Sequence, residues 1–269
     1  MKNSTIRTII YILIALAVMI PLFKPFNMPV PISDPVIKAY DIMEKLKPGD
    51  MALFSFDFGP GGKPECYPGA VATLRHAFKK NVKVVAVCLF PEGALFTQKA
   101  LQTTAKEYNK EYGVDYINLG YKSGEIAALQ KMIGNMKEAF PLDHLGEKTG
   151  KFSIMDNVKT IKDFKVILDF SSAYPGVREY ITIAQAQTKV PVIGCVTAVN
   201  ATEFYPYLQS GQLAGLLGGM KGSAEYEELL KIKGTATSGM DSQSICHLLI
   251  IFLIIITNVI YFTERKKKN

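Results

Sequence analysis

The sequence contains little of what metal sites and disulfide frameworks need. It has four cysteines and three histidines in 269 residues, with no C-x-x-C pair and no Cys/His spacing suited to zinc. We therefore expect no metal site. Cys88 and Cys195 lie in apolar runs, where a small buried thiol is common, and Cys246 lies in a long apolar segment. Only Cys66 lies in a polar stretch, and it is the cysteine that we expect to be reactive or cross-linked.

Nucleotide-binding motifs are also missing. The run GPGGKPE over residues 59–65 departs from a phosphate loop because proline follows Lys63. No G-x-G-x-x-G pattern follows the apolar run at residues 51–58 that precedes it. Two interpretations of the run stay open. It is either a plain structural turn or an anion-binding nest with Lys63 as counter-charge, formed by Gly59, Gly61 and Gly62.

A serine nucleophile is not indicated either. Ser171 and Ser172 lie in the run DFSSA, which lacks the G-x-S-x-G elbow of serine hydrolases. Neither His76 nor His144 has an acidic partner that the sequence places beside it. A Ser-His-Asp hydrolase is therefore not expected.

The long central part of the chain has almost no net charge. The formal net charge is +7, but residues 1–24 and 264–269 carry nearly all of it, leaving about +1 for the residues between. A nucleic-acid-binding domain needs a basic face of its own, so the composition argues against a nucleic-acid partner.

What the sequence does have is two long apolar runs. Residues 245–262 (ICHLLIIFLIIITNVIYF) contain no acidic or basic side chain except His247, and a basic tail follows directly. Residues 8–23 form a shorter run. We predict an N-terminal signal anchor over residues 1–24 rather than a cleaved signal peptide, because no small-x-small cleavage site follows it. Residues 234–244 are small and polar and are predicted to tether the domain to a C-terminal transmembrane helix with a basic tail, residues 245–269.

The basic residues that flank these runs predict the topology. Lys2 and Arg7 precede the first run, and residues 265–268 follow the second. Basic flanks stay in the cytoplasm. We therefore expect a two-pass protein of the cell membrane with both termini cytoplasmic and residues 25–233 forming an extracytoplasmic domain.

The central domain alternates between apolar strands and amphipathic helices. Strands are expected at residues 51–58, 82–90, 115–119, 165–171 and 190–197. Apolar stripes between them, such as the one over residues 126–140, predict covering helices. The predicted fold class is α/β, with a doubly wound, mainly parallel five-stranded sheet of Rossmann-like type. The expected strand order is 3-2-1-4-5, with 2-1-3-4-5 as the alternative. Residues 141–162 form an insertion with room for a short helix, and it is placed to lie over the sheet edge as a lid.

Acidic and hydroxyl side chains stand where the strands end. In an open α/β sheet, ligands bind beyond the carboxyl edge at the point where the strand order reverses, here between the first and fourth strands. Asp57 and Asp169 end those strands and Glu92 ends the second, so the three are candidate catalytic carboxylates. The alternative is that they cap helices or pair with Lys63 and Arg178. Candidate ligand-binding residues at the same edge are Gly59, Gly61, Gly62, Lys63, Ser171, Ser172 and Thr197.

Glycines recur at short spacing over residues 206–230. Each costs roughly 1 kcal/mol relative to alanine in a helix, so this density indicates close approach of another backbone. That backbone belongs either to the same domain or to another subunit. The candidate interface residues are Gly211, Gly215, Gly218, Gly219 and Gly222.

The runs LFSFDFGPGG, VVAVCLFPEG and YPYLQSGQLAGLLGGMKG, spread over most of the chain, resemble an uncharacterised family of bacterial two-span membrane proteins with a central α/β domain. The resemblance implies the architecture and no activity, cofactor or catalytic residue.

Three functions follow from these features as expectations. The leading one is a membrane-anchored scaffold that binds a ligand or partner and associates with copies of itself or another membrane protein. The alternatives are a hydrolase or glycosyl-modifying enzyme at the membrane surface, and an accessory or sensor subunit. No cofactor can be assigned, and whether the protein is an enzyme stays open.

Overall fold

The computed structural model describes residues 3–26 and 28–268. They divide into two units, Val30–Ala236 and the two chain ends, Met1–Pro29 with Thr237–Asn269. The expected alternation of strands and helices is present in the first unit, and two long apolar helices make up most of the second.

The central unit is built on a parallel sheet of six strands, ordered β3-β2-β1-β4-β5-β6. The predicted order 3-2-1-4-5 is confirmed over the first five strands, and the alternative order is wrong. The predicted number is corrected from five to six, because four residues of the glycine-rich segment pair with β5. The strands are β1 (Met51–Asp57), β2 (Lys83–Cys88), β3 (Tyr116–Tyr121), β4 (Val166–Ser171), β5 (Val192–Val196) and β6 (Gly215–Gly218).

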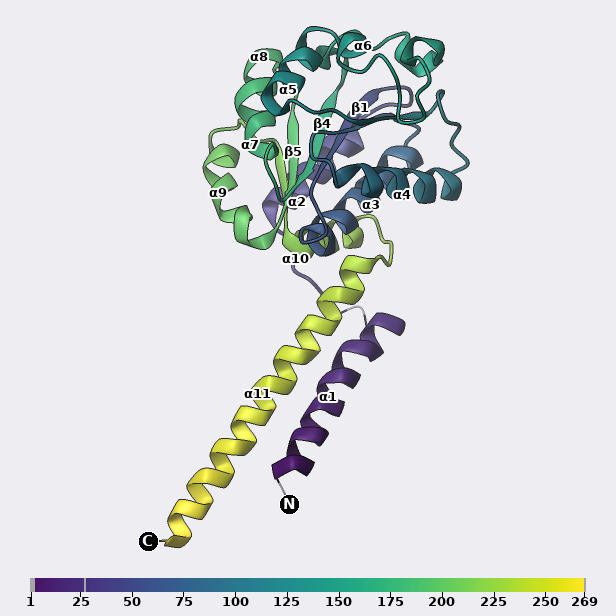
Figure 1. The fold of residues 1–269 in the computed structure, drawn as a ribbon. Helices are drawn as coiled ribbons and strands as arrows, with labels where there is room; N and C mark the ends of the chain where they lie inside the picture. Colours follow the sequence, from purple (N-terminus) through teal and green to yellow (C-terminus); the bar gives the residue numbers. More distant parts are fainter. Residues whose placement is uncertain (1–2, 27, 269) are drawn as a thin grey trace. The chain divides into compact units, whose positions relative to one another are not determined.

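Helices cover both faces of this sheet (Figure 1). One face is packed by α2 (Asp34–Lys45), α3 (Lys63–Lys79), α4 (Gly93–Glu107) and α10 (Gly219–Leu229). The other face is packed by α5 (Glu125–Gly134), α6 (Met136–Ala139), α9 (Ala198–Gln209) and a helix made of α7 (Val177–Glu179), the π-helical η4 (Tyr180–Gln185) and α8 (Ala186–Thr188). Because both faces are covered, every residue of β1, β4 and β5 is buried.

The stripe over residues 126–140 forms two helices instead of one. The chain turns at Asn135, whose side chain accepts hydrogen bonds from the N–H groups of Lys137 and Glu138 and so starts α6. The insertion that follows has no α-helix and instead contains three short 3-10 turns, η1 (Thr149–Lys151), η2 (Ser153–Met155) and η3 (Ile161–Asp163).

This insertion lies along the outer edge of the sheet. The N–H of His144 donates to the Asn118 carbonyl of β3 at 3.1 Å, and the N–H of Ile154 donates to the Gly113 carbonyl at 3.0 Å. The insertion also contributes buried side chains to the core on the sheet face that α5, α6 and α9 cover, namely Ile154, Met155, Val158 and Ile161. The insertion thus covers an edge strand whose backbone would otherwise be open to other chains.

The second unit contains α1 (Asn3–Phe23) and α11 (Thr235–Lys268). Both are long and apolar enough to cross a membrane, over 20 residues (Ser4–Phe23) and 29 residues (Thr235–Thr263). The segment predicted as a polar tether is helical from Thr235 onwards. Inside this unit the Ser242 hydroxyl donates to the Val18 carbonyl at 3.1 Å, and the Met28 N–H donates to Asp241 at 3.0 Å.

Candidate functional site

Two of the predicted carboxylates lie side by side inside the sheet. In the register of β1 and β4, Ser55 is opposite Asp169 and Asp57 is opposite Ser171. Residues two apart on a strand, and residues directly opposite on its neighbour, share one face of a sheet. Both aspartates therefore lie on the face covered by η4, and neither has any exposed surface.

Asp57 holds the ends of two strands together. Its Oδ1 accepts hydrogen bonds from the N–H groups of Leu89 at 2.5 Å and Phe90 at 3.2 Å, just beyond β2. Its Oδ2 accepts from the Ser55 hydroxyl at 2.5 Å, and that hydroxyl accepts from the Tyr180 hydroxyl at 2.8 Å. Asp57 is thus fully engaged within the protein.

Asp169 is as fully buried as Asp57, but it lacks comparable hydrogen-bond donors. Neither of its carboxylate oxygens has a hydrogen bond within the described residues. Burial raises the pKa of Asp57 to about 6, although its hydrogen bonds act in the opposite direction. Burial, together with the negative charge of Asp57, raises the pKa of Asp169 well above its usual value. The pair therefore keeps a proton at pH values where two exposed aspartates are fully ionised.

The cations that the sequence offered as partners lie elsewhere. Arg178 forms an ion pair with Glu203, and the Lys63 ammonium lies over the Phe96 ring, 5.6 Å from its centroid. Glu92 is exposed and precedes α4 without capping it. The three candidate carboxylates therefore do not converge in one pocket.

The crevice expected between β1 and β4 is closed. A Cβ on Gly62 would lie 2.1 Å from the Ser172 hydroxyl, so the loops after these two strands are in direct contact. The Ser172 N–H also donates to the Asp57 carbonyl at 3.3 Å. The N–H groups of Gly62 and Lys63 both donate to the Gly59 carbonyl at 3.1 Å, which favours a structural turn over an anion nest. Gly61 is exposed, with nothing near its Cβ position.

A pocket opens one strand further along, between the loop after β4 and the start of α9. Its volume is about 310 Å³, and its lining comes from residues 171–179 and 196–204. Ser172, Tyr174 and Asn200 contribute polar groups, and Arg178 and Glu203 contribute opposite charges. Ser171 also lines it, but the Ser171 hydroxyl accepts from the Val177 N–H at 3.1 Å and so fixes the loop.

Thr197 precedes α9 without capping it by its side chain. The cap comes from α3 instead, because Glu65 Oε2 accepts from the Ala198 N–H at 2.8 Å. A carboxylate at a helix N-terminus is favourable in the field of the helix dipole. Glu65 therefore joins α3 to α9 and leaves Thr197 at the rim.

Four of the five candidate interface glycines pack inside the domain. A Cβ on Gly215 would lie 2.6 Å from the Ala39 Cα of α2, and one on Gly222 would lie 2.8 Å from the Leu217 backbone. Gly218 and Gly219 are packed against Ala201 and Ala198 of α9. Gly211 has φ +74° with nothing near its Cβ position, as a turn requires. Close approach within the domain therefore accounts for the glycine-rich segment.

The prediction of a polar environment for Cys66 is wrong. Cys66 lies in α3 and is fully buried, because the loop containing it is shorter than the sequence indicated. The neighbouring Cys195 thiol and burial raise the pKa of Cys66 well above its usual value. A buried thiol with a raised pKa is a poor nucleophile.

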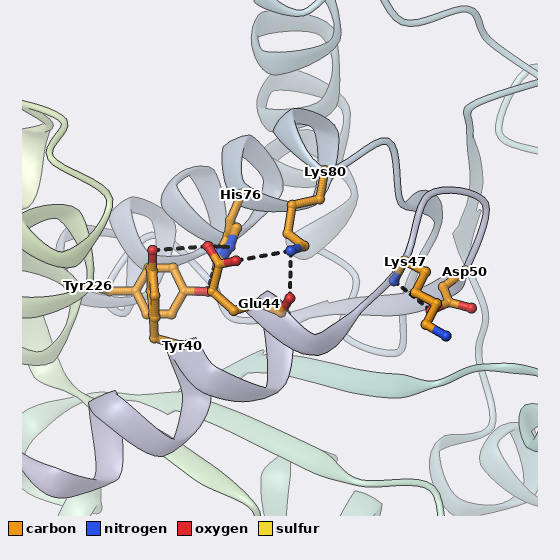
Figure 2. Close-up of polar contacts among 7 residues, drawn as sticks. All are labelled: Tyr40, Glu44, Lys47, Asp50, His76, Lys80 and Tyr226. Carbon is orange, nitrogen blue, oxygen red and sulfur yellow. Dashed lines mark hydrogen bonds and ion pairs between the residues drawn. The ribbon is translucent and has the colours of Figure 1, made fainter.

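His76 has the acidic partner that the sequence did not place (Figure 2). The ring is fully buried, with Nε2 at 3.0 Å from Glu44 Oε1 and Nδ1 at 2.7 Å from the Tyr226 hydroxyl. Glu44 also accepts from Tyr40 and Lys80, each at 3.0 Å. The cluster joins α2, α3 and α10, and hydrogen bonds from its neighbours, Lys80 above all, lower the pKa of Glu44 to about 2.

Several polar residues at the carboxyl edge escaped prediction. Tyr180 belongs to an apolar stripe that indicated only packing, and Asn200 and Glu203 lie on α9, for which no stripe was predicted. Arg178 was named only as a possible partner of the candidate carboxylates, and its partner is Glu203. Burial periodicity separates the faces of a helix but does not say which polar residue meets which strand. Ser55 alone carried a signal, as a hydroxyl two residues before Asp57 in an otherwise apolar strand.

No protein-family model matches the chain, and no curated protein matches its sequence.

Proposed function

We propose that the protein is a membrane-anchored α/β module that binds a small, uncharged or zwitterionic polar molecule in the pocket between the β4–α7 loop and α9. The observation that carries this proposal is the pocket itself. It lies at the carboxyl edge of a parallel sheet, where ligands of such folds bind, and its charged lining residues are Arg178, Glu179 and Glu203. Glu179 accepts a hydrogen bond from the Gly176 N–H at 2.8 Å, so Arg178 and Glu203 are the opposite charges on which the proposal relies.

The residues around the pocket suit recognition of a polar ligand. Ser172 and Asn200 line it, and their side chains make no hydrogen bond within the described chain. Arg178 and Glu203 pair with each other but are 56% and 41% exposed. An exposed ion pair contributes only about 0–1 kcal/mol, so the two side chains can separate at little cost to meet the ammonium and carboxylate of a zwitterion.

The anchoring part of the proposal rests on α1 and α11. We propose that both cross the cell membrane with the chain termini in the cytoplasm, so that the ligand is bound on the outer side. The exposed apolar surfaces of both helices support the crossing, and their basic flanks support this orientation.

Ligand binding is tested by thermal unfolding of the full chain in detergent with a panel of amino acids, sugars and nucleosides. A ligand at ten times its Kd stabilises the folded state by about 1.4 kcal/mol, which raises the Tm by about 3 °C. We expect at least one amino acid or sugar to do so. Asn200→Ala should abolish the shift.

Gln130→Ala is the matched control, because Gln130 is exposed on α5 and outside the pocket. It should leave the shift unchanged. The proposal is overturned if no compound of the panel raises the Tm, or if both variants lose the shift equally.

The alternative of a membrane-surface enzyme is less well supported. Asp57 is engaged by hydrogen bonds, Asp169 has no exposed surface, and Glu92 is exposed to solvent, so the three carboxylates have different environments. Self-association stays a prediction, since the glycines that motivated it are used inside the domain.

A further inference from the structure

A second and larger cavity lies at the carboxyl end of β3. Its volume is about 530 Å³, and it is lined by the start of α4, residues 118–122 and residues 139–144, from the end of α6 into the insertion. No residue of the pocket described above lines it. The proposed function does not use it.

An acidic side chain is fixed beside this cavity. Asp143 is 6% exposed, and its Oδ1 accepts from the N–H groups of Leu145 and Glu147, both at 2.9 Å. Its Oδ2 accepts from the Tyr112 hydroxyl at 2.7 Å. The insertion therefore holds both the carboxylate and the tyrosine in one orientation.

The tyrosine and a backbone carbonyl orient His144. Its Nδ1 lies 3.1 Å from the Tyr112 hydroxyl and 3.1 Å from the Asn118 carbonyl. A carbonyl oxygen only accepts, so Nδ1 carries the proton of the neutral ring and Nε2 carries the free electron pair. His144 lines the cavity, and its Nε2 has no hydrogen bond within residues 3–26 and 28–268. The sequence placed no acidic partner beside His144, and the structure corrects this, because the Tyr112 hydroxyl links His144 to Asp143.

Three donors without partners line the same cavity. Asn118 is 3% exposed, and its Oδ1 accepts from the Gly120 N–H at 3.0 Å, so that the amide NH₂ is left free. Within the described part of the chain, the Gln98 amide and the Lys122 ammonium also form no hydrogen bond or ion pair. Among the described residues, the only buried side-chain nitrogen or oxygen atoms without a partner are the two Asp169 oxygens, so the Asn118 NH₂ remains accessible from the cavity that Asn118 lines.

We propose that this cavity binds a small molecule through an anionic group, a carboxylate or a phosphate. Lys122 supplies the opposite charge, the NH₂ groups of Asn118 and Gln98 donate to the anionic oxygens, and His144 Nε2 accepts a hydrogen bond from the same molecule. Asp143 and Tyr112 are positioning residues that keep His144 in this tautomer. Asp143 itself faces the backbone N–H groups and Tyr112, so its charge is already engaged.

Nuclear magnetic resonance of the full chain in detergent, with ¹³C at the histidine Cε1 position, tests the proposal. The chain has three histidines, and His144→Gln identifies the His144 signal. Inorganic phosphate and acetate are titrated separately at fixed pH and ionic strength. We expect a saturable shift of the His144 signal with a Kd on the order of 1 mM for at least one of them. The tighter anion identifies which group the cavity takes.

Charge-matched variants separate a built site from general attraction. Lys122→Met should raise the Kd at least about tenfold, whereas Lys99→Met, an exposed lysine of α4 outside the cavity, should not change it. Asn118→Asp keeps the acceptor for the Gly120 N–H but replaces the donor by a negative oxygen, so binding should be lost. The proposal is overturned if neither anion gives a saturable shift up to about 50 mM, or if the two lysine variants weaken binding equally.

Discussion

Asp57 and Asp169 are alike in burial and unlike in what surrounds them. Asp57 accepts three hydrogen bonds, whereas Asp169 accepts none within the described residues. The difference arises from position. Asp57 is the last residue of β1 and meets the free N–H groups beyond β2, while Asp169 lies inside β4 and faces β1 and β5. The same residue type therefore has two roles at one sheet edge.

Replacement of the two aspartates should separate these roles. Asp57→Ala leaves the N–H groups of Leu89 and Phe90 buried without an acceptor, which should lower the free energy of unfolding by about 2–5 kcal/mol. Asp169→Asn removes a charge that burial and Asp57 disfavour, so at pH 8 it should preserve or raise stability. Thermal unfolding followed by circular dichroism checks both variants, with Glu92→Gln as the exposed control. Equal losses in both variants would contradict this account.

Asp57 and Asp169 should also make stability depend on pH. Their contribution falls as pH rises, whereas most carboxylates, with lowered pKa values, contribute more as pH rises. Folding raises the pKa of Asp57 from its unfolded value of 3.8 to about 6, and that of Asp169 well above 3.8. The folded state then binds more protons at these two groups, so the contribution of the pair to stability is greatest below pH 4 and falls as pH rises through 6. The difference in Tm between wild type and Asp169→Asn isolates this effect, because the other titrating groups are common to both. That difference should grow between pH 4 and pH 8.

At the scale of elements, the His76 cluster determines how α2 is attached. In the neutral ring that donates from Nε2 to Glu44, Nδ1 accepts from the Tyr226 hydroxyl of α10. Every ring nitrogen is thus satisfied, although the side chain is fully buried. The second attachment of α2 is at Gly215 of β6, where the absence of a side chain lets the helix backbone lie against the strand.

Tyr226→Phe should therefore loosen the packing of α2, α3 and α10. It removes the hydroxyl and leaves a buried ring nitrogen without a partner, which should reduce the free energy of unfolding by about 1–2 kcal/mol. Tyr108→Phe is the matched control, since the Tyr108 hydroxyl makes no hydrogen bond within the described residues, and it should change stability by less than about 0.5 kcal/mol. Denaturant unfolding in detergent measures both, and equal effects would show that the contact with His76 contributes nothing.

At the scale of the whole molecule, cysteine labelling tests the proposed membrane orientation. Cys66, Cys88 and Cys195 are buried, so a Cys246→Ser background contains no exposed native thiol among the described residues. Ser123→Cys on the surface of the domain should react in intact cells with a maleimide that cannot cross membranes. Thr263→Cys, near the end of α11, should react only after the cells are permeabilised. The opposite pattern would place the domain in the cytoplasm.

Most of the architecture follows from local pattern. Apolar runs such as residues 165–171, and apolar stripes such as the one at Val177 and Ile181, show which surfaces of a strand or helix are buried. This can be read from each segment without knowing which other elements cover it. Right-handed crossovers between parallel strands left two strand orders open, 3-2-1-4-5 and 2-1-3-4-5, and the structure has the first over its first five strands. The two long apolar helices were evident from length and composition alone.

Only the tertiary structure decided what lies at the functional edge. The strand β6 was missed because its four residues are mostly glycine and leucine and have no alternation to detect. The contact of Gly62 with Ser172, the isolation of Asp169 and the link from Asp143 through Tyr112 to His144 each join residues from separate segments. Hydrophobic pattern is a property of each segment, whereas the meeting of two polar side chains depends on register, loop path and packing of the whole domain. For that reason the sequence indicated five of the six strands and the two long apolar helices, and only the folded chain decided which polar side chains meet and where pockets open.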